Sequence, residues 1–174
     1  MRVLLLSAIL FAALTGGANV TASERSVPAV PANPGAPEER AAAQQAVARF
    51  LAQVDRGREQ EAWADVSELM IIGAGSLENW RANLAAMHAD IGHSASRKLL
   101  KIGFTDGLGD LPKGKYYILH FAGTFERATA LEELAVVLER GKWRVAGYIV
   151  SGVKRRSESA GSAPNNSCMD SSCK

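Results

Sequence analysis

The body of this 174-residue sequence lacks cysteine, because its only two cysteines, Cys168 and Cys173, lie among the last seven residues. An oxidising compartment permits a disulfide between them, but that bond closes only a short loop at the chain end. We therefore predict a Cys168–Cys173 disulfide that leaves the stability of the main domain to its hydrophobic core.

The sequence also lacks an excess of charge of either sign. It has 20 Lys and Arg residues and 18 Asp and Glu residues, which gives a net charge of +2 at pH 7. A chain without a wide basic surface cannot neutralise many phosphates, so no nucleic-acid partner is expected. The basic run Lys154, Arg155 and Arg156 is too short for stable attachment to an anionic membrane, and a solvated segment is the preferred interpretation.

No apolar run after residue 14 is long enough to span a bilayer. Residues 1–22 instead have the three parts of a cleavable signal peptide: a basic start at Arg2, an apolar stretch at 3–14, and small residues ending at Ala22. A lipoprotein signal is excluded because Gly17 stands where the acylated cysteine would be. We therefore predict a periplasmic or secreted protein with no stable membrane insertion after processing.

Proline and glycine divide the remaining chain into segments. The proline-rich stretch 23–36 is typical of an extended linker. Apolar residues at helical spacing predict three helices, at 37–55, 59–70 and 76–92. Alternating apolar residues predict four strands, at 97–105, 115–126, 131–140 and 143–151, and residues 152–174 form a polar tail predicted to be disordered.

Helices followed by a meander of strands predict an α+β domain over residues 37–151. Three N-terminal helices would pack on one face of a curved four-stranded antiparallel sheet. This order of elements is that of the NTF2-like or cystatin-like arrangement, which can leave a pocket at its open end. In the second strand, Tyr117, Leu119 and Phe121 would share one face and His120 would lie on the other.

Several motifs occur in an order that is similar to a known bacterial family. They are Phe50-Leu51 through Asp55 and Gly57 to Glu61-Ala62-Trp63, then Trp80, Gly92 with Arg97-Lys98-Leu99, Leu111-Pro112 with Gly114 and Tyr116, and the closing run from Gly141 to Tyr148. Together they resemble the exported domain-of-unknown-function family 4019 over residues 41–151. The resemblance implies an exported NTF2-like α+β domain, and it supplies no catalytic residue.

The histidines and nearby acids are the candidate metal ligands and catalysts of this sequence. His88 and His93 are five residues apart, which is not the spacing of a helical ligand pair, so neither a metal nor a cofactor is expected. The candidate catalytic pair is His120 and Glu126, with Tyr148 opposite. Six strand residues would separate the two by about 20 Å, so we predict no essential catalytic pair there.

The candidate ligand-binding residues are Trp80, Arg97 and Tyr148. Trp80, like Trp63 and Trp143, is interpreted first as a core anchor, and a shallow aromatic groove is the alternative. Arg97 is expected to pair with a helix carboxylate such as Glu68 or Asp90.

The lack of a catalytic constellation favours an exported, non-enzymatic binding or accessory module for an unknown protein partner or small ligand. Two alternatives stay open: a small-molecule enzyme that uses acid and base residues in a pocket, and a structural domain that self-associates as a homodimer. An enzyme requires polar groups that converge in a closed cavity, a binding module requires an apolar pocket, and a dimer requires an exposed apolar sheet face.

Overall fold

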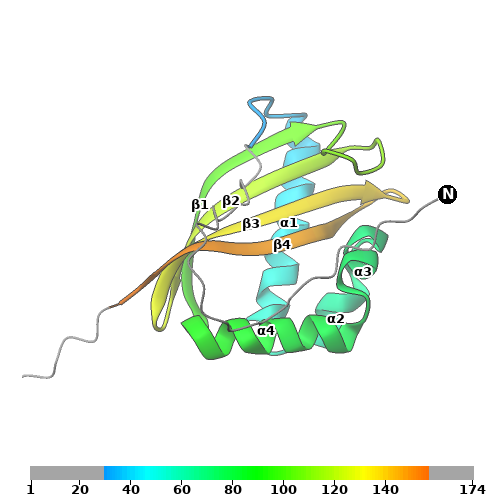
Figure 1. Ribbon diagram of the computed structural model, residues 1–174. Coiled ribbons are helices and arrows are strands. Elements are labelled where there is room, and N and C mark those ends of the chain that lie inside the picture. Colours follow the sequence, from blue (N-terminus) through cyan, green and yellow to red (C-terminus); the bar gives the residue numbers. More distant parts are fainter. Residues whose placement is uncertain (1–29, 157–174) are drawn as a thin grey trace, which may run out of the picture.

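The computed structural model describes residues 30–156, in which four helices precede four strands (Figure 1). The helices are α1 (Pro37–Val54), α2 (Glu59–Ala64), α3 (Glu68–Ala74) and α4 (Leu77–Ile91). The strands are β1 (Ser94–Thr105), β2 (Tyr116–Phe125), β3 (Ala128–Glu139) and β4 (Lys142–Arg155). They form one antiparallel sheet in the order β1-β2-β3-β4, which confirms the predicted α+β class. The predicted signal peptide and the two cysteines lie outside the described residues.

The second predicted helix, 59–70, is divided into α2 and α3. Between them Val66 forms a parallel bridge with Val145 of β4, and the Ser67 N–H donates to the Val145 carbonyl at 2.9 Å. The Ser67 hydroxyl then caps α3 by accepting the Met70 N–H at 3.3 Å. The chain therefore leaves the helix for three residues because the edge of the sheet offers it a hydrogen-bonding partner.

Three of the four strands are longer than their apolar patterns suggested. The fourth strand was expected to end at Ser151, but β4 continues to Arg155, which lies opposite Ala128 of β3. Backbone pairing holds Lys154 and Arg155 opposite Thr129 and Ala128 whatever their side chains are, so their polarity did not indicate a strand.

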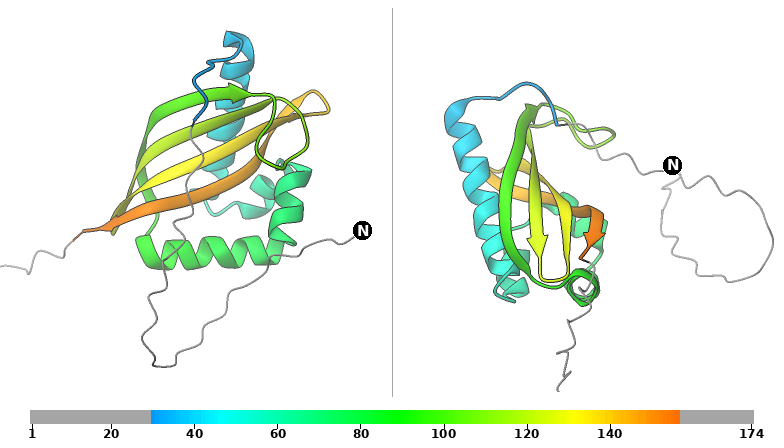
Figure 2. Two further views of the ribbon diagram at one scale, coloured as in Figure 1. Left: turned by 45° about the horizontal axis from the view of Figure 1, so that its top comes forward. Right: turned by 90° about the vertical axis from the view of Figure 1, so that its left-hand side faces the viewer.

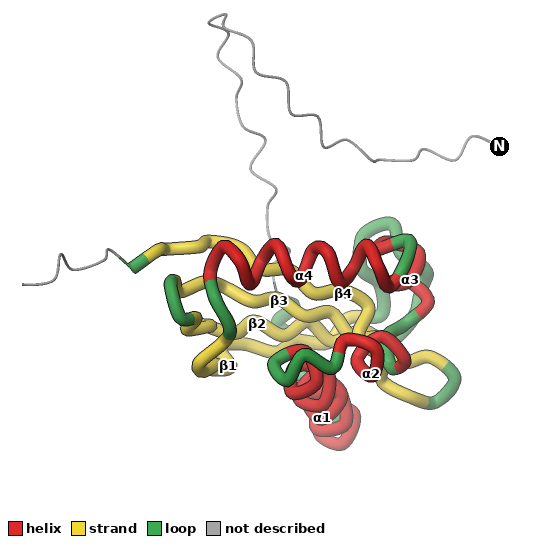
Figure 3. Tube along the Cα trace, turned by 90° about the horizontal axis from the view of Figure 1, so that it is seen from below, coloured by secondary structure: helices red, strands yellow, loops and turns green. Residues whose placement is uncertain are grey.

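The helices cover one face and one end of the curved sheet. Figure 2 shows α1 along one face, and Figure 3 shows α4 crossing the end of the sheet that lies lowest in Figure 1. The inward side chains of β2 are those that alternation predicted: Tyr117 and Leu119 are fully buried, and Phe121 is partly buried against the same core. None of the described helices is both long and apolar enough to cross a membrane.

All three tryptophans lie in or against this core. Trp80 and Trp143 are buried, and the half-buried Trp63 packs on Trp80 with 5.5 Å between ring centroids. Trp143 contacts Tyr117 at a centroid distance of 5.1 Å. The interpretation as core anchors is confirmed.

The segment before α1 lies against the sheet. A Cβ on Gly103 of β1 would lie only 2.0 Å from the Pro31 carbonyl oxygen and 2.9 Å from a methyl group of Val30. Gly103 lies opposite Ile118, on the face turned away from the main core. The chain then follows β1, where the Phe104 N–H donates to the Asn33 carbonyl at 2.7 Å. This end of the predicted linker is therefore attached to the domain.

Candidate functional site

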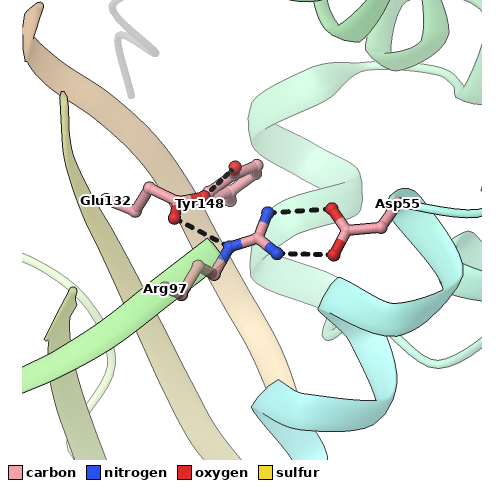
Figure 4. Close-up of polar contacts among 4 residues, drawn as sticks. All are labelled: Asp55, Arg97, Glu132 and Tyr148. Atoms are coloured by element: carbon pink, nitrogen blue, oxygen red, sulfur yellow. Dashed lines mark hydrogen bonds and ion pairs between the residues drawn. The ribbon is translucent and has the colours of Figure 1, made fainter. Parts of the chain in front are cut away.

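A network of four side chains lies between α1 and the inner face of the sheet, with Arg97 at its centre (Figure 4). Two guanidinium nitrogens of Arg97 donate to the two carboxylate oxygens of Asp55, at 2.5 and 2.9 Å, and its Nε donates to Glu132 Oε2 at 2.7 Å. The Tyr148 hydroxyl donates to the other Glu132 oxygen at 2.6 Å. We refer to Asp55, Arg97, Glu132 and Tyr148 as the inner network.

Four elements contribute one residue each to the inner network. Asp55 is the C-cap of α1, Arg97 lies on β1, Glu132 on β3 and Tyr148 on β4. Arg97 and Glu132 are separated by β2, where Gly123 lies opposite Arg97. A Cβ at Gly123 would lie 2.7 Å from Glu132 Oε2, so the missing side chain leaves the space in which the ion pair forms.

The charges of this network interact strongly because the side chains that carry them are largely buried. The Glu132 side chain has no exposed area, and that of Arg97 is 14% exposed. Burial alone would lower the pKa of Arg97, but its hydrogen bonds and ion pairs with Asp55 and Glu132 raise it above the ordinary value. Burial, followed by the charge of Glu132, raises the pKa of Tyr148 far above its ordinary value. Arg97 is therefore a permanent cation, and Tyr148 remains a neutral donor.

A groove of about 500 Å³ lies beside the network, between α3, α4 and β4. We call it the α4 groove. Its wall consists mainly of apolar side chains and backbone, and it includes two of the predicted ligand-binding candidates, Trp80 and Tyr148. The lining residues are Leu69, Met70, Gly73, Ala74, Trp80, Asn83, Leu84, Met87, Ala146, Gly147, Tyr148, Ile149 and Val150.

The third candidate, Arg97, lines a different groove. This second groove, of about 310 Å³, runs between α1 and strands β1 and β2, and Asp55 and Arg97 are its charged residues. The inner network thus lies between two grooves. Tyr148 borders one of them, and the Asp55–Arg97 pair borders the other.

Arg97 pairs with a helix carboxylate, as expected, but this is Asp55 at the end of α1 and not either of the two residues named as examples, which are engaged elsewhere. Glu68 pairs with Arg140, and Asp90 pairs with Arg155 at 2.5 Å. The actual partner, Asp55, caps the C-terminal end of α1, which lies near the start of β1. The residue pattern within one helix or one strand does not reveal that these two ends are close.

The catalytic candidates His120 and Glu126 lie in different surroundings. His120 Nε2 lies 2.7 Å from Glu133 Oε2, a residue directly opposite on β3. Glu126 follows β2 in the hairpin turn and accepts the His93 N–H at 3.1 Å. The His120–Glu133 pair was missed because the third strand was expected to begin at Leu131. A two-residue turn after Phe125 would have placed residues 120 and 133 opposite each other.

The His120–Glu133 pair is on the opposite side of the sheet from the inner network. His120 alternates with Leu119 and Phe121, whose side chains line the second groove. A substrate in either groove would therefore not meet this pair.

His88 and His93 are neighbours in space, with 4.5 Å between their ring centroids. Burial, followed by the proximity of His93, lowers the pKa of His88. No third ligand joins them: within residues 30–156, no three or more His, Cys, Asp or Glu side chains are grouped so that they could hold a metal ion.

Comparison with known proteins identifies a family. The family model described as a protein of unknown function (DUF4019) matches residues 46–148, which is more than half of the chain. All four residues of the inner network lie within the matched region. No curated protein and no solved structure matches the chain.

Proposed function

We propose that this chain, which belongs to the DUF4019 family, is an exported, non-enzymatic binding module that holds a small ligand in the α4 groove. The observation that carries the proposal is the contrast between the apolar wall of the groove and the polar residues beside it. Those residues are already paired with one another, whereas the apolar wall is open to a ligand. Its volume falls within the roughly 300–1,000 Å³ range of small-molecule sites.

The same pairing argues against an enzyme. A general base must come within hydrogen-bond reach of the reacting atom. Glu132 is fully buried and lines neither groove, and the Asp55 carboxylate is held by two hydrogen bonds from Arg97. Neither His120 nor Glu133 is among the residues that line the two grooves. A binding role therefore fits the arrangement better than proton transfer does.

Two further parts of the proposal are export and the NTF2-like arrangement. The apolar stretch 3–14 and the small residues before Ser23 support export through a cleaved signal peptide. The order of helices and strands, with α4 across one end of the curved sheet, supports an NTF2-like arrangement in which a groove at the open end receives the ligand.

Titration of the mature protein with the neutral fluorescent probe N-phenyl-1-naphthylamine tests the proposed groove. Gly73 lines the groove, and a Cβ added there meets nothing within 4 Å. The Cβ of Gly73→Phe therefore has room, and its ring should occupy part of the groove and weaken probe binding at least tenfold. Gly73→Ala is the matched control, because it makes the same backbone change without the bulk, and it should bind like the parent. Equal binding by the Phe variant would overturn the assignment.

A further inference from the structure

We propose that the ligand of the α4 groove is a cationic amphiphile, with an apolar body and a single amine or quaternary ammonium end. This inference rests on the proposed binding function and adds the chemical class of the ligand. It follows from the charge of the inner network, the lack of a positively charged side chain in the groove wall, and the aromatic surface of that wall.

The inner network carries one uncompensated negative charge. Asp55 and Glu132 contribute two carboxylates, and Arg97 contributes one guanidinium. The Glu132 carboxylate is fully buried and lies one hydrogen bond behind Tyr148, which is part of the groove wall. None of the residues that line the α4 groove is charged. A negative charge in such weakly polar surroundings is poorly screened, so it attracts a cation more strongly than it would in water.

An anionic ligand finds no cationic partner in this groove. The Tyr148 hydroxyl already donates its proton to Glu132, and three nitrogens of Arg97 already donate to carboxylates. The donors that the lining residues still offer are neutral, such as the side-chain amide of Asn83 and backbone N–H groups of the edge strand β4. A carboxylate placed here would lose its hydration and would also be repelled by Glu132.

Aromatic rings supply the second attraction for a cation. Trp80 and Tyr148 both contribute to the wall, and Phe50 joins them behind it, at centroid distances of 5.9 Å from Trp80 and 6.0 Å from Tyr148. Aromatic faces attract amine and quaternary ammonium groups, and most strongly where water is excluded. The methionines of the wall, Met70 and Met87, suit a flexible apolar body because their side chains adapt to its shape.

Three probes with the same ten-carbon chain test the inference: decyltrimethylammonium, decanol and decanoate, each titrated below its micelle concentration into the mature protein. Calorimetry should give at least tenfold tighter binding for the cation than for decanol, and the weakest binding for decanoate. If none of the three binds, the proposed binding function fails. If they bind with decanoate equal to or tighter than the cation, the function stands and the ligand class is wrong.

Variants then identify the source of the preference. Asp55→Asn makes the inner network neutral, and it should reduce the preference for the cation over decanol to less than about threefold while decanol binding stays unchanged. Glu39→Gln removes the same charge at the other end of α1, where Glu39 pairs with Lys115, and it should keep the full preference. If Asp55→Asn does not fold, Glu132→Gln removes the second carboxylate in its place. A folded neutral variant that keeps the tenfold preference would overturn the inference.

Discussion

Gly123 leaves open the space that the buried carboxylate of Glu132 occupies, since a Cβ at residue 123 would lie 2.7 Å from Glu132 Oε2. The same Cβ would lie 2.8 Å from the ring of Phe125. The side chain is absent at the one position of β2 that lies between Arg97 and Glu132. The ion pair across β2 therefore depends on a glycine that carries no charge itself.

Gly123→Ala should destabilise the domain by about 1–3 kcal/mol, because an extra methyl group in a packed site forces its neighbours to move. Here the neighbour that must move is a buried carboxylate held by two hydrogen bonds. Urea unfolding measures the change. Gly147→Ala is the control, because its nearest new contact is Ala135 at an ordinary 4.0 Å. Equal midpoints for both variants and the parent would contradict the account of Gly123.

Arg97→Met should cost about 3–5 kcal/mol, the range for breaking a buried ion pair and leaving one charge without its partner. The unpartnered group is Glu132, which keeps only the Tyr148 hydroxyl as a donor. Replacing both charges in Arg97→Met/Glu132→Leu should restore part of the loss, since the buried carboxylate is then absent as well.

The control for this prediction is Arg140→Met. Arg140 pairs with Glu68, but both side chains are well exposed, at 86% and 65%. Exposed pairs contribute about 0–1 kcal/mol. Chemical denaturation of the three variants would contradict the prediction if the Arg97 and Arg140 substitutions had equal effects.

Stability should fall as the pH decreases because of His88. Burial, and then the proximity of His93, lowers the pKa of His88 below the ordinary value of 6.5. The unfolded chain therefore takes up a proton at a higher pH than the folded protein does. The stabilising contribution of neutral His88 to the unfolding free energy is therefore fully present above the pKa of the unfolded chain. It is lost as the pH falls from about 6.5 through the lower pKa of the folded protein.

His88→Gln should make the unfolding free energy less dependent on pH in this window. His93→Gln should act in the same direction, because it removes the neighbouring ring that disfavours protonation of His88. Thermal melts at pH 7.5 and 5.0 measure how much stability each protein loses between the two pH values. Lys98→Gln, a substitution at an exposed position of β1, serves as the control. A parent protein and a His88 variant with the same pH dependence would show that His88 is not responsible.

Export predicts a defined new N-terminus. N-terminal sequencing of protein recovered from the periplasm or medium should begin near Ser23, because small residues precede it where signal peptidase cleaves. Asn19 is the alternative start. Recovered protein that retains Met1 would contradict export by cleavage.

Much of the fold follows from local patterns, whereas the inner network does not. Alternation along β2 predicted which face carries Tyr117 and Leu119, because successive side chains of a strand point to opposite faces. These two residues belong to the main core, whereas Tyr116 and Ile118, which are also buried, do not. Arg97 and Tyr148 were singled out separately, but their shared partner Glu132 was not. The meeting of β1, β3 and β4 depends on the register of three strand pairs, which the composition of each strand does not determine.

One signal in β3 could have identified Glu132. In this strand Glu132 alternates with Leu134 and Val136, two apolar residues of the core face. A carboxylate in line with them must be buried, and a buried carboxylate requires a donor. The predicted strand began at Leu131 and so contained this pattern. The donor itself, Arg97, lies two strands away, and its position could not be deduced without the sheet order.

The close approach of the segment before α1 to β1 leads to the last prediction. Gly103→Ala would place a methyl group 2.0 Å from the Pro31 carbonyl oxygen, so one of the two backbones must move. The β1 backbone is held by its ladder to β2, whereas residues 30–36 lie outside that ladder and are held by the buried Val30 and by the Phe104–Asn33 and Tyr117–Ala36 hydrogen bonds. We expect the segment to separate from the sheet while the domain stays folded. Hydrogen exchange should then show faster exchange of the Phe104 amide with little change in the amides of β3. Unchanged protection at Phe104 would mean that the sheet, rather than the segment, accommodates the methyl group.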